Sequence, residues 1–370
     1  MKKRIGILSS SRADYSIYRP LLLALKESGR YDVFLIAFGT HLSQQHGNTV
    51  NAIEQDGFNV DVKLNCLPQN GSPAGIAENM GEVMREFAKI WNNAHYDLVL
   101  CLGDRFEMFS AVAAALPFNI PIAHLYGGET TAGAIDDALR HSITHMSRYH
   151  FTSCETYKKR VIQLIGNEKG VFNAGALSYD NLKHLQLPEK DELSTDIGVN
   201  FNRPVILTTF HPETVNFNKN AEYAREVAGA LEQLTNFEVL ITMPNADTMN
   251  EVIRNEFEQL SQNFSHVHTR ENLGTLRYLA AMKHCALMLG NTSSGFVEAS
   301  WFPTPVVNLG LRQQGRIVTQ NIVQCDIEKN SILKAVETAS ALHFSHWERI
   351  YGNGNSAEYI LGKIDEILAN

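Results

Sequence analysis

No hydrophobic stretch of this 370-residue sequence approaches the roughly 20 residues that a membrane-spanning helix needs. After Met1–Arg4, the apolar run Ile5–Leu8 is too short to be the hydrophobic segment of a signal peptide. We therefore expect a protein that has no membrane partner and works in the cytoplasm.

Cysteine is also scarce, because the chain has five cysteines, an odd number, and they are widely spaced. Cys101, Cys154 and Cys285 stand beside apolar runs, where a reduced thiol packs as a small hydrophobic group. This usage argues against a disulfide-stabilised secreted protein and agrees with a cytoplasmic location.

Signatures of cofactor binding are missing as well. No Gly-x-Gly-x-x-Gly follows the first apolar run and there is no Walker loop, which disfavours a dinucleotide cofactor and ATP. His141 and His145 lie four residues apart, without an acid in the zincin position or an evident third ligand. We therefore expect no cofactor and no metal. The net charge of −8 disfavours a general nucleic-acid surface, although a local basic pocket stays compatible with it.

The sequence does carry the pattern of an α/β protein. Its hydrophobic content of 44% and charged content of 19% are those of a soluble folded protein, and its length favours two domains. Short apolar runs alternate with amphipathic segments, which is typical of parallel sheets covered by helices. The expected strands are Ile5–Leu8, Val33–Phe38, Leu98–Leu102, Ile120–Leu125, His150–Ser153, Val205–Thr209, Val239–Thr242, Ala286–Leu289 and Val306–Leu309. The expected helices are Tyr18–Ser28, Glu78–Trp91, Asp136–Arg148, Ala221–Leu234, Leu273–Met282 and Ala357–Leu368.

A polar, charge-rich segment with a proline near each end, residues 187–203, is expected to link the domains. This predicts an N-terminal Rossmann-like domain at 1–186, a C-terminal one at 204–352 and a helix within 353–370 that could pack back on the first domain. Because ligands of open α/β sheets bind beyond the carboxyl ends of the strands, two such domains would line a cleft from both sides.

The most informative stretch is Gly290–Glu298, a small polar turn after an apolar run and before an expected helix. Backbone N–H groups and hydroxyls at a helix start can bind a phosphate, and Glu298, one turn further on, could reach a ribose hydroxyl. The alternative is an N-capped helix whose Thr292, Ser293 and Ser294 satisfy only its own amides.

Acidic residues also follow expected strands. Asp104 and Arg105 come directly after Leu98–Leu102, and Glu129 and Asp136 follow the next strand. Carboxylates gathered at one site raise one another's pKa and suit proton transfer. An ion pair for Asp104 and a helix cap for Asp136 are the structural alternatives.

Arg105 could bind a negatively charged ligand, and three further cationic side chains could bind a diphosphate: Arg12, Arg312 and Arg316. The structural alternative is that these arginines lie on a solvated face. His211, at a strand end before Pro212, is a stronger candidate for ligand contact than His141 or His145.

Taken in order, these motifs closely resemble one family, the hydrolysing UDP-N-acetylglucosamine 2-epimerases of sialic-acid biosynthesis. The resemblance runs from about residue 4 to residue 320. It rests on residues 11–16 (Ser-Arg-Ala-Asp-Tyr-Ser), 103–107 (Gly-Asp-Arg-Phe-Glu), 127–129 (Gly-Gly-Glu), 135–141, 210–214 (Phe-His-Pro-Glu-Thr), 244–247 (Pro-Asn-Ala-Asp), 290–295 and 312–316 (Arg-Gln-Gln-Gly-Arg).

The resemblance implies two Rossmann-like domains in a GT-B-type arrangement, with a UDP-sugar bound in the interdomain cleft and no redox cofactor. It implies release of UDP and N-acetylmannosamine. We also expect the chain to form a homo-oligomer, a dimer or a tetramer. Catalytic acids would be Asp104, Glu129 and Asp136. Substrate and UDP contacts would fall on Arg12, Ser16, Arg105, Tyr126, His211, Asn245, Thr292, Ser293, Ser294, Glu298 and Arg312.

Some relatives carry an acid at the position of Tyr126, so the catalytic acids do not transfer one to one there. Other functions stay open: the same reaction on UDP-N,N'-diacetylbacillosamine, a non-hydrolysing epimerase, a GT-B glycosyltransferase, or a catalytically silent UDP-sugar sensor. The three acids argue against the sensor, since nucleotide binding has little use for them.

Overall fold

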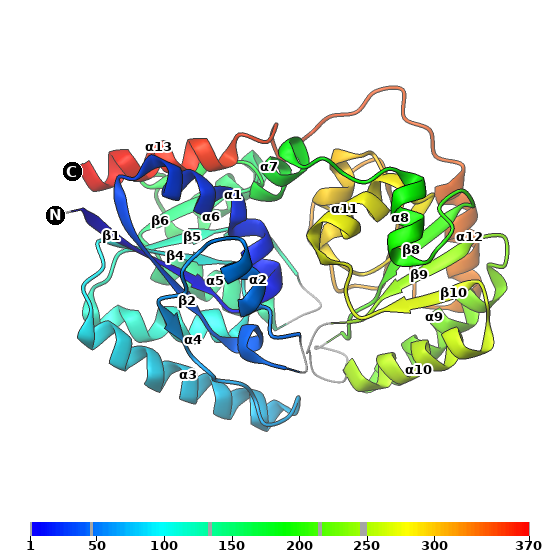
Figure 1. Cartoon of the computed structure of the whole chain (residues 1–370), viewed down its shortest axis with the longest axis horizontal. Coiled ribbons are helices and arrows are strands. Elements are labelled where there is room, and N and C mark those ends of the chain that lie inside the picture. Colours follow the sequence, from blue (N-terminus) through cyan, green and yellow to red (C-terminus); the bar gives the residue numbers. More distant parts are fainter. Residues whose placement is uncertain (1, 45–46, 132–134, 214–216, 245–249, 370) are drawn as a thin grey trace. The chain divides into compact units, whose positions relative to one another are not determined.

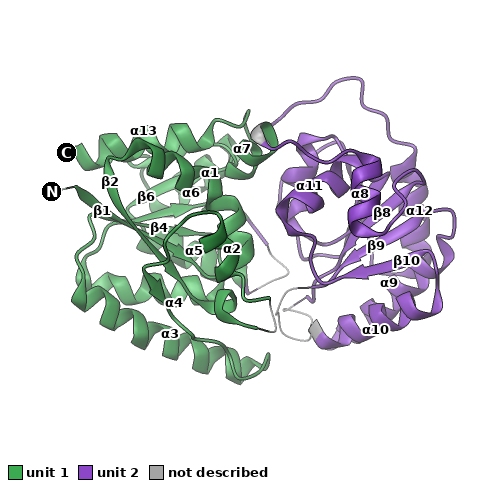
Figure 2. Cartoon of the chain, viewed as in Figure 1, with its two compact units in different colours: residues 1–129, 136–183, 350–370 green, residues 130–135, 184–349 purple. Residues whose placement is uncertain are grey.

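The computed structural model describes residues 2–44, 47–131, 135–213, 217–244 and 250–369. By its internal contacts the chain divides into two compact units, coloured separately in Figure 2. Unit 1 contains residues 1–129, 136–183 and 350–370, and unit 2 contains residues 130–135 and 184–349. Each unit is built on its own parallel sheet.

The sheet of unit 1 has seven strands in the order β3-β2-β1-β4-β5-β6-β7, and every described pair is parallel. Figure 1 labels five of them, β1, β2, β4, β5 and β6. The strands are β1 Lys3–Ser9, β2 Tyr31–Ala37, β3 Val62–Lys63, β4 Leu98–Leu102, β5 Ile122–Leu125, β6 Tyr149–Thr152 and β7 Val171–Asn173. The helices are α1 Arg12–Ser28, α2 Val50–Gln55, α3 Pro73–Asn93, α4 Phe106–Ala115, α5 Asp136–Met146, α6 Glu155–Ile165, α7 Leu177–His184 and α13 Ser356–Ala369, with short 3₁₀ turns η1 Gly39–Leu42 and η2 Leu116–Phe118.

Helix α13 belongs to unit 1 although it follows unit 2 in the sequence. It packs against α1 (Figure 1), and its first two amides, those of Ser356 and Ala357, donate to the carboxylate of Asp180 on α7 at 3.0 and 2.9 Å. A carboxylate at a helix N-terminus satisfies amides that lack a partner within the helix. Asp180 is buried, so this cap is part of the core of unit 1.

The sheet of unit 2 has six strands in the order β10-β9-β8-β11-β12-β13, again parallel throughout its described pairs. The strands are β8 Val205–Thr209, β9 Glu238–Thr242, β10 Val267–Arg270, β11 Leu287–Gly290, β12 Val306–Leu309 and β13 Ile322–Cys325. The helices are α8 Lys190–Ile197, α9 Asn220–Gln233, α10 Asn250–Asn263, α11 Gly274–His284 and α12 Lys329–Ser340, with 3₁₀ turns η3 Phe217–Lys219, η4 Ser293–Gly295 and η5 Glu298–Trp301.

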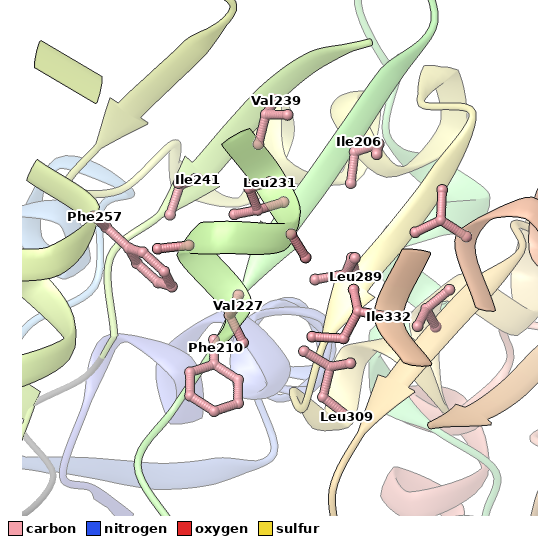
Figure 3. Close-up of a cluster of buried hydrophobic side chains, with 14 of the residues drawn as sticks. Ile206, Phe210, Val227, Leu231, Val239, Ile241, Phe257, Leu289, Leu309 and Ile332 are labelled. Atoms are coloured by element: carbon pink, nitrogen blue, oxygen red, sulfur yellow. The ribbon is translucent and has the colours of Figure 1, made fainter. Parts of the chain in front are cut away.

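Both faces of the unit 2 sheet are covered. Ile206 of β8 points to one cluster, shown in Figure 3 with Val227 and Leu231 of α9. Its neighbours Val205 and Leu207 belong to a second cluster, with side chains of α8 and α11. Since successive strand residues point to opposite faces, a strand buried on both sides must be apolar throughout, which is why these strands read as unbroken hydrophobic runs.

The two parallel sheets with alternating helices confirm the predicted α/β class. The segment expected to be a linker, 187–203, contains helix α8, and its Leu193 and Ile197 are part of the core of unit 2. Within the described ranges, no helix is long and apolar enough to cross a membrane. All five cysteines are free, with Cys101 and Cys154 buried and Cys285 partly buried.

Candidate functional site

Several of the predicted site residues follow the strands at which each sheet changes direction, whereas Tyr126, Glu129 and Asp136 come after β5 and Arg312 comes after β12. In unit 1, β1 and β4 are neighbours. The strands β2 and β3 extend the sheet on the β1 side, and β5, β6 and β7 extend it on the β4 side. In unit 2, β8 and β11 hold the same position. A crevice at the carboxyl ends of the strands marks this point in open parallel sheets, and ligands bind there. The residues that follow these four strands are 10–12, 103–105, 210–213 and 291–294.

After β1, the loop before Arg12 is fixed by a buried carboxylate. Asp14 accepts hydrogen bonds from Ser10 N and Oγ at 2.8 and 2.7 Å, and from Ser11 N and Oγ at 3.1 and 3.0 Å. Burial raises the pKa of Asp14, opposed by the hydrogen bond from Ser10 and by the charge of Arg105. Arg12 is the first residue of α1, so this cap sets where its side chain leaves the backbone; Ser16 lies one turn further along the helix.

After β4, Arg105 is held by a second buried acid. Its Nε and Nη2 donate to the two carboxylate oxygens of Glu107 at 3.2 and 3.0 Å, and the Glu107 side chain is 1% exposed. A bidentate pair fixes the plane of the guanidinium, but it also shares the charge that a phosphate would use. Arg105 is therefore a well-oriented donor with a carboxylate already beside it.

The structure brings two of the three predicted catalytic acids onto one arginine. Arg140 of α5 donates through Nη2 to Oδ2 of Asp104, and its Nη1 lies 3.7 Å from Oε2 of Glu129. Nη1 also donates to the carbonyl of Tyr126 at 2.9 Å, and Ser153 Oγ donates to Glu129 at 2.7 Å. The Arg140 and Glu129 side chains are each 4% exposed, whereas Asp104 retains 19% exposure. Of the two acids, Asp104 is thus the more accessible to a substrate.

The third predicted acid, Asp136, is the first residue of α5, the helix that carries Arg140. The next residue, Asp137, has its carboxylate 3.6 Å from the imidazole of His141. This histidine is occupied within its own helix, and the described residues hold no group of three or more His, Cys, Asp or Glu side chains that could bind a metal ion.

Tyr126 has an unusual backbone for a non-glycine residue. Its φ is +65°, in the left-handed region, and its amide and carbonyl are both bonded, to the carbonyl of Phe151 and to Arg140. Such strained positions cost about 1–3 kcal/mol and cluster at functional sites. Two residues before Tyr126, burial lowers the pKa of His124 to about 3. The His124 ring is therefore neutral, and its Nε2 donates to the Gly103 carbonyl at 2.8 Å.

In unit 2, the stretch after β11 differs from the expected helix. Residues 293–295 and 298–301 form two short 3₁₀ turns, η4 and η5, so the aligned dipole of a long helix is missing within this described segment. Thr292 caps η4, and its Oγ1 lies 3.0 Å from Ser294 Oγ, which is in turn 2.9 Å from the hydroxyl of Tyr278. The phosphate hypothesis here therefore depends on amides and hydroxyls rather than on a helix dipole. Glu298 begins η5.

Two further unit 2 candidates, His211 and Arg312, form hydrogen bonds with Asn291, the residue that precedes Thr292. His211 is buried, and its backbone is bonded to the side chain of Asn291. Arg312, after β12, donates to the Asn291 carbonyl at 3.3 Å. Arg316 is also buried and donates to Gln313. Asn245 lies outside the described residues.

Sequence reasoning missed the residues that hold these side chains in place. One of them had a signal: Asp14 stands three residues after Ser11, which is the spacing of a capping box. Arg140 lies within the motif 135–141, but composition and helical spacing do not distinguish it from a surface arginine, because its burial depends on residues 36 and 11 positions away.

Comparison with known proteins gives one consistent result. Over residues 23–365 the sequence matches the family described as UDP-N-acetylglucosamine 2-epimerase. It is 36% identical to a GDP/UDP-N,N'-diacetylbacillosamine 2-epimerase (hydrolyzing) of Campylobacter jejuni, covering 93% of this chain and 89% of that protein. It is 35% identical to the polysialic acid biosynthesis protein P7 of Escherichia coli, covering 90% and 85%. The crystal structure of UDP-GlcNAc 2-epimerase from Neisseria meningitidis bound to UDP-GlcNAc superposes with a TM-score of 0.84 at 18% identity, over 98% of this chain and all of that one.

Proposed function

Because the chain belongs to the UDP-N-acetylglucosamine 2-epimerase family, we propose that it is a hydrolysing 2-epimerase that converts UDP-N-acetylglucosamine and water into UDP and N-acetylmannosamine. The observation that carries this proposal is the pair of acids, Asp104 and Glu129, held on Arg140 at the ends of neighbouring strands. Nucleotide binding by itself has little use for two carboxylates held together in this way.

The reaction needs two proton transfers and one elimination. A base removes the proton at C2 of the sugar while the bond from C1 to the diphosphate oxygen breaks, which leaves a glycal with a C1–C2 double bond and releases UDP. Water then adds its hydroxyl to C1, and a proton returns to C2 on the opposite face. We assign these transfers to Asp104, Glu129 and Asp136, and each correctly placed acid or base contributes typically about 10²–10⁴-fold to the rate.

The leaving diphosphate develops negative charge, which cationic and N–H donors can stabilise. We assign this task to the groups that follow β1, β4, β8, β11 and β12, and the contact of the ribose hydroxyls to Glu298. The proposed UDP contacts are Arg12, Ser16, Arg105, His211, Asn245, Thr292, Ser293, Ser294, Glu298 and Arg312.

A second candidate substrate is UDP-N,N'-diacetylbacillosamine, because the relative from Campylobacter jejuni is named for the diacetylbacillosamine reaction. We propose that Tyr126 contributes to this choice, since its backbone is fixed beside the acid pair and a phenol offers an apolar face and one hydroxyl. The kcat/KM ratio for the two substrates should change in Tyr126→Phe or Tyr126→His; an unchanged ratio in both variants would remove Tyr126 as a specificity residue.

The decisive experiment is to incubate the protein with UDP-N-acetylglucosamine in deuterated water and follow the products by NMR. We expect free N-acetylmannosamine with deuterium at C2, together with UDP, without added NAD. Retention of the proton at C2 would contradict proton abstraction. Recovery of UDP-N-acetylmannosamine would indicate a non-hydrolysing epimerase, and unchanged substrate would favour a sensor.

Substitutions separate the acids from their structural alternatives. Asp104→Asn, Glu129→Gln and Asp136→Asn should each reduce turnover by about 10²-fold or more while UDP binding is largely kept, since the amides retain shape and lose the base. Asp137→Asn is the matched control on the same helix and should stay near wild type. Equal turnover in all four variants would leave the acids as caps and ion-pair partners only.

A further inference from the structure

The segment that follows β8 is held by two buried asparagines. Asn291 Oδ1 accepts from the amide of His211 at 2.7 Å, and its Nδ2 donates to the carbonyl of the same residue at 2.8 Å. Asn220 repeats this arrangement two residues later, with Glu213, at 2.9 and 3.0 Å. Both asparagines are fully buried, and Pro212 between the two clamped residues has a fixed φ. The backbone that carries the His211 side chain is thus fixed on both sides.

Asn291 also forms hydrogen bonds with residues of the loop that follows β12. Its backbone carbonyl accepts from Nη1 of Arg312 at 3.3 Å and from Nε2 of Gln313 at 2.7 Å. Its own amide donates to the carbonyl of Thr209 at 3.2 Å, which ties it to the end of β8. One residue therefore contacts both His211 and Arg312, which lie 80 and 21 positions away, and it immediately precedes Thr292.

Only an amide side chain can make this clamp. The peptide group of His211 presents a donor and an acceptor, and the asparagine amide offers the complementary pair. Aspartate has nearly the same shape, but its carboxylate can only accept, so it would face the His211 carbonyl with a second oxygen. A buried polar atom without its partner costs free energy, and the local backbone would move to avoid this contact.

We propose that Asn291 is a positioning residue for the nucleotide: it fixes His211 and Arg312 relative to each other before UDP binds. This inference rests on the proposed function, because both side chains are proposed UDP contacts. Groups that are already fixed lose less conformational freedom on binding, so preorganisation raises affinity without adding a contact.

The test measures UDP affinity by calorimetry in Asn291→Asp and in a matched control, Asn321→Asp. Asn321 is also fully buried in unit 2 and makes two side-chain hydrogen bonds, but to Thr304 and Thr319. Comparable melting temperatures of the two variants would show that the general cost of a buried charge is matched. We expect Asn291→Asp to weaken UDP binding by at least 10-fold and Asn321→Asp by less than 3-fold. Equal affinities of the two variants would overturn the proposal.

A double-substitution cycle distinguishes positioning from general destabilisation. His211→Ala should weaken UDP binding by about 10-fold or more in the wild-type chain, as expected for a lost hydrogen bond to a charged group. In the Asn291→Asp background it should weaken binding by less than 3-fold, because the ring is no longer held in place. If His211→Ala weakened UDP binding by the same factor in both backgrounds, the positioning role of Asn291 would be refuted but the proposed function would stand. A wild-type protein that does not bind UDP would refute the proposed function itself.

Discussion

Arg140 offers the sharpest test of how the acid pair is held. Replacing it with methionine keeps much of the side-chain volume but removes the charge, which leaves Asp104 and Glu129 close together without their shared cation. Glu129 keeps its hydrogen bond from Ser153, and Asp104 keeps contact with solvent through its 19% exposed side chain. Both carboxylates would nevertheless lose their contact with the guanidinium, and the carbonyl of Tyr126 would lose a donor.

Breaking a buried ion pair by removing one partner costs about 3–5 kcal/mol. Because Asp104 is partly exposed, we expect Arg140→Met to lower the free energy of unfolding by about 3 kcal/mol, at the low end of that range. At about 2–4 °C per kcal/mol for a folding unit of about 150–250 residues, a range that includes unit 1, the melting temperature of unit 1 should fall by roughly 6–12 °C. Arg140→Lys should lose less, because it keeps the charge but not the fork that reaches both acids.

Urea unfolding at pH 7 and pH 5, followed by circular dichroism, measures this loss. The deficit of Arg140→Met should shrink at pH 5, since protonation of a carboxylate removes the unpaired charge. Arg85→Met is the control, because the Arg85 side chain is 69% exposed and surface substitutions change stability by about 0.5 kcal/mol or less. A deficit below about 1 kcal/mol at pH 7, or one that is the same at both pH values, would refute the reasoning.

Two further predictions concern stability. Gly290→Ala should lower the free energy of unfolding in urea by about 3 kcal/mol or more, because a Cβ at this position would lie 2.0 Å from a carbonyl oxygen of β8. The control is Gly81→Ala on α3, where a Cβ would meet open space and should stabilise the protein by about 0.5–1 kcal/mol. Similar results for both variants would contradict the close approach at Gly290. Burial lowers the pKa of His41 and His150 to about 4 and of His124 to about 3, so below about pH 6.5 the unfolded chain binds protons that the folded chain does not. Stability should therefore be full well above pH 6.5 and fall as the pH drops, by about 2 kcal/mol per histidine at pH 5; no fall between pH 7.5 and 5 would contradict this.

The elements that the sequence predicts best are those whose burial is regular. The run Val205–Thr209 is β8 residue for residue, and the run Leu98–Leu102 is β4, because a central parallel strand is apolar on both faces. The edge strands β3 and β13 escape prediction, since β3 has two residues and only the first of the four residues of β13 is buried. Helix α8 was not predicted because its sequence is rich in charged residues. Of its eight residues, Leu193 and Ile197 are the apolar ones that pack in the core, and the others are polar.

The candidate site divides in the same way. Residues that follow a strand could be predicted, because parallel topology alone brings the carboxyl ends of strands to one edge of the sheet. The contacts that orient them could not, since the clamp on His211 and the arginine between the acids depend on side chains that only the folded chain brings together. Identifying which polar residues are buried requires the three-dimensional structure.

The capping of α13 by Asp180 has a consequence for synthesis of the protein. Residues 184–349 leave the ribosome before residues 350–369, so almost all of unit 2 is available to fold while unit 1 still lacks its last helix. During that interval Asp180 has no amides to cap, and the surface of α1 that α13 covers stays exposed to water. Nascent chains released before residue 356 should therefore contain an incomplete first unit and a nearly complete second one, and the surface of α1 that α13 covers would be accessible to chaperones.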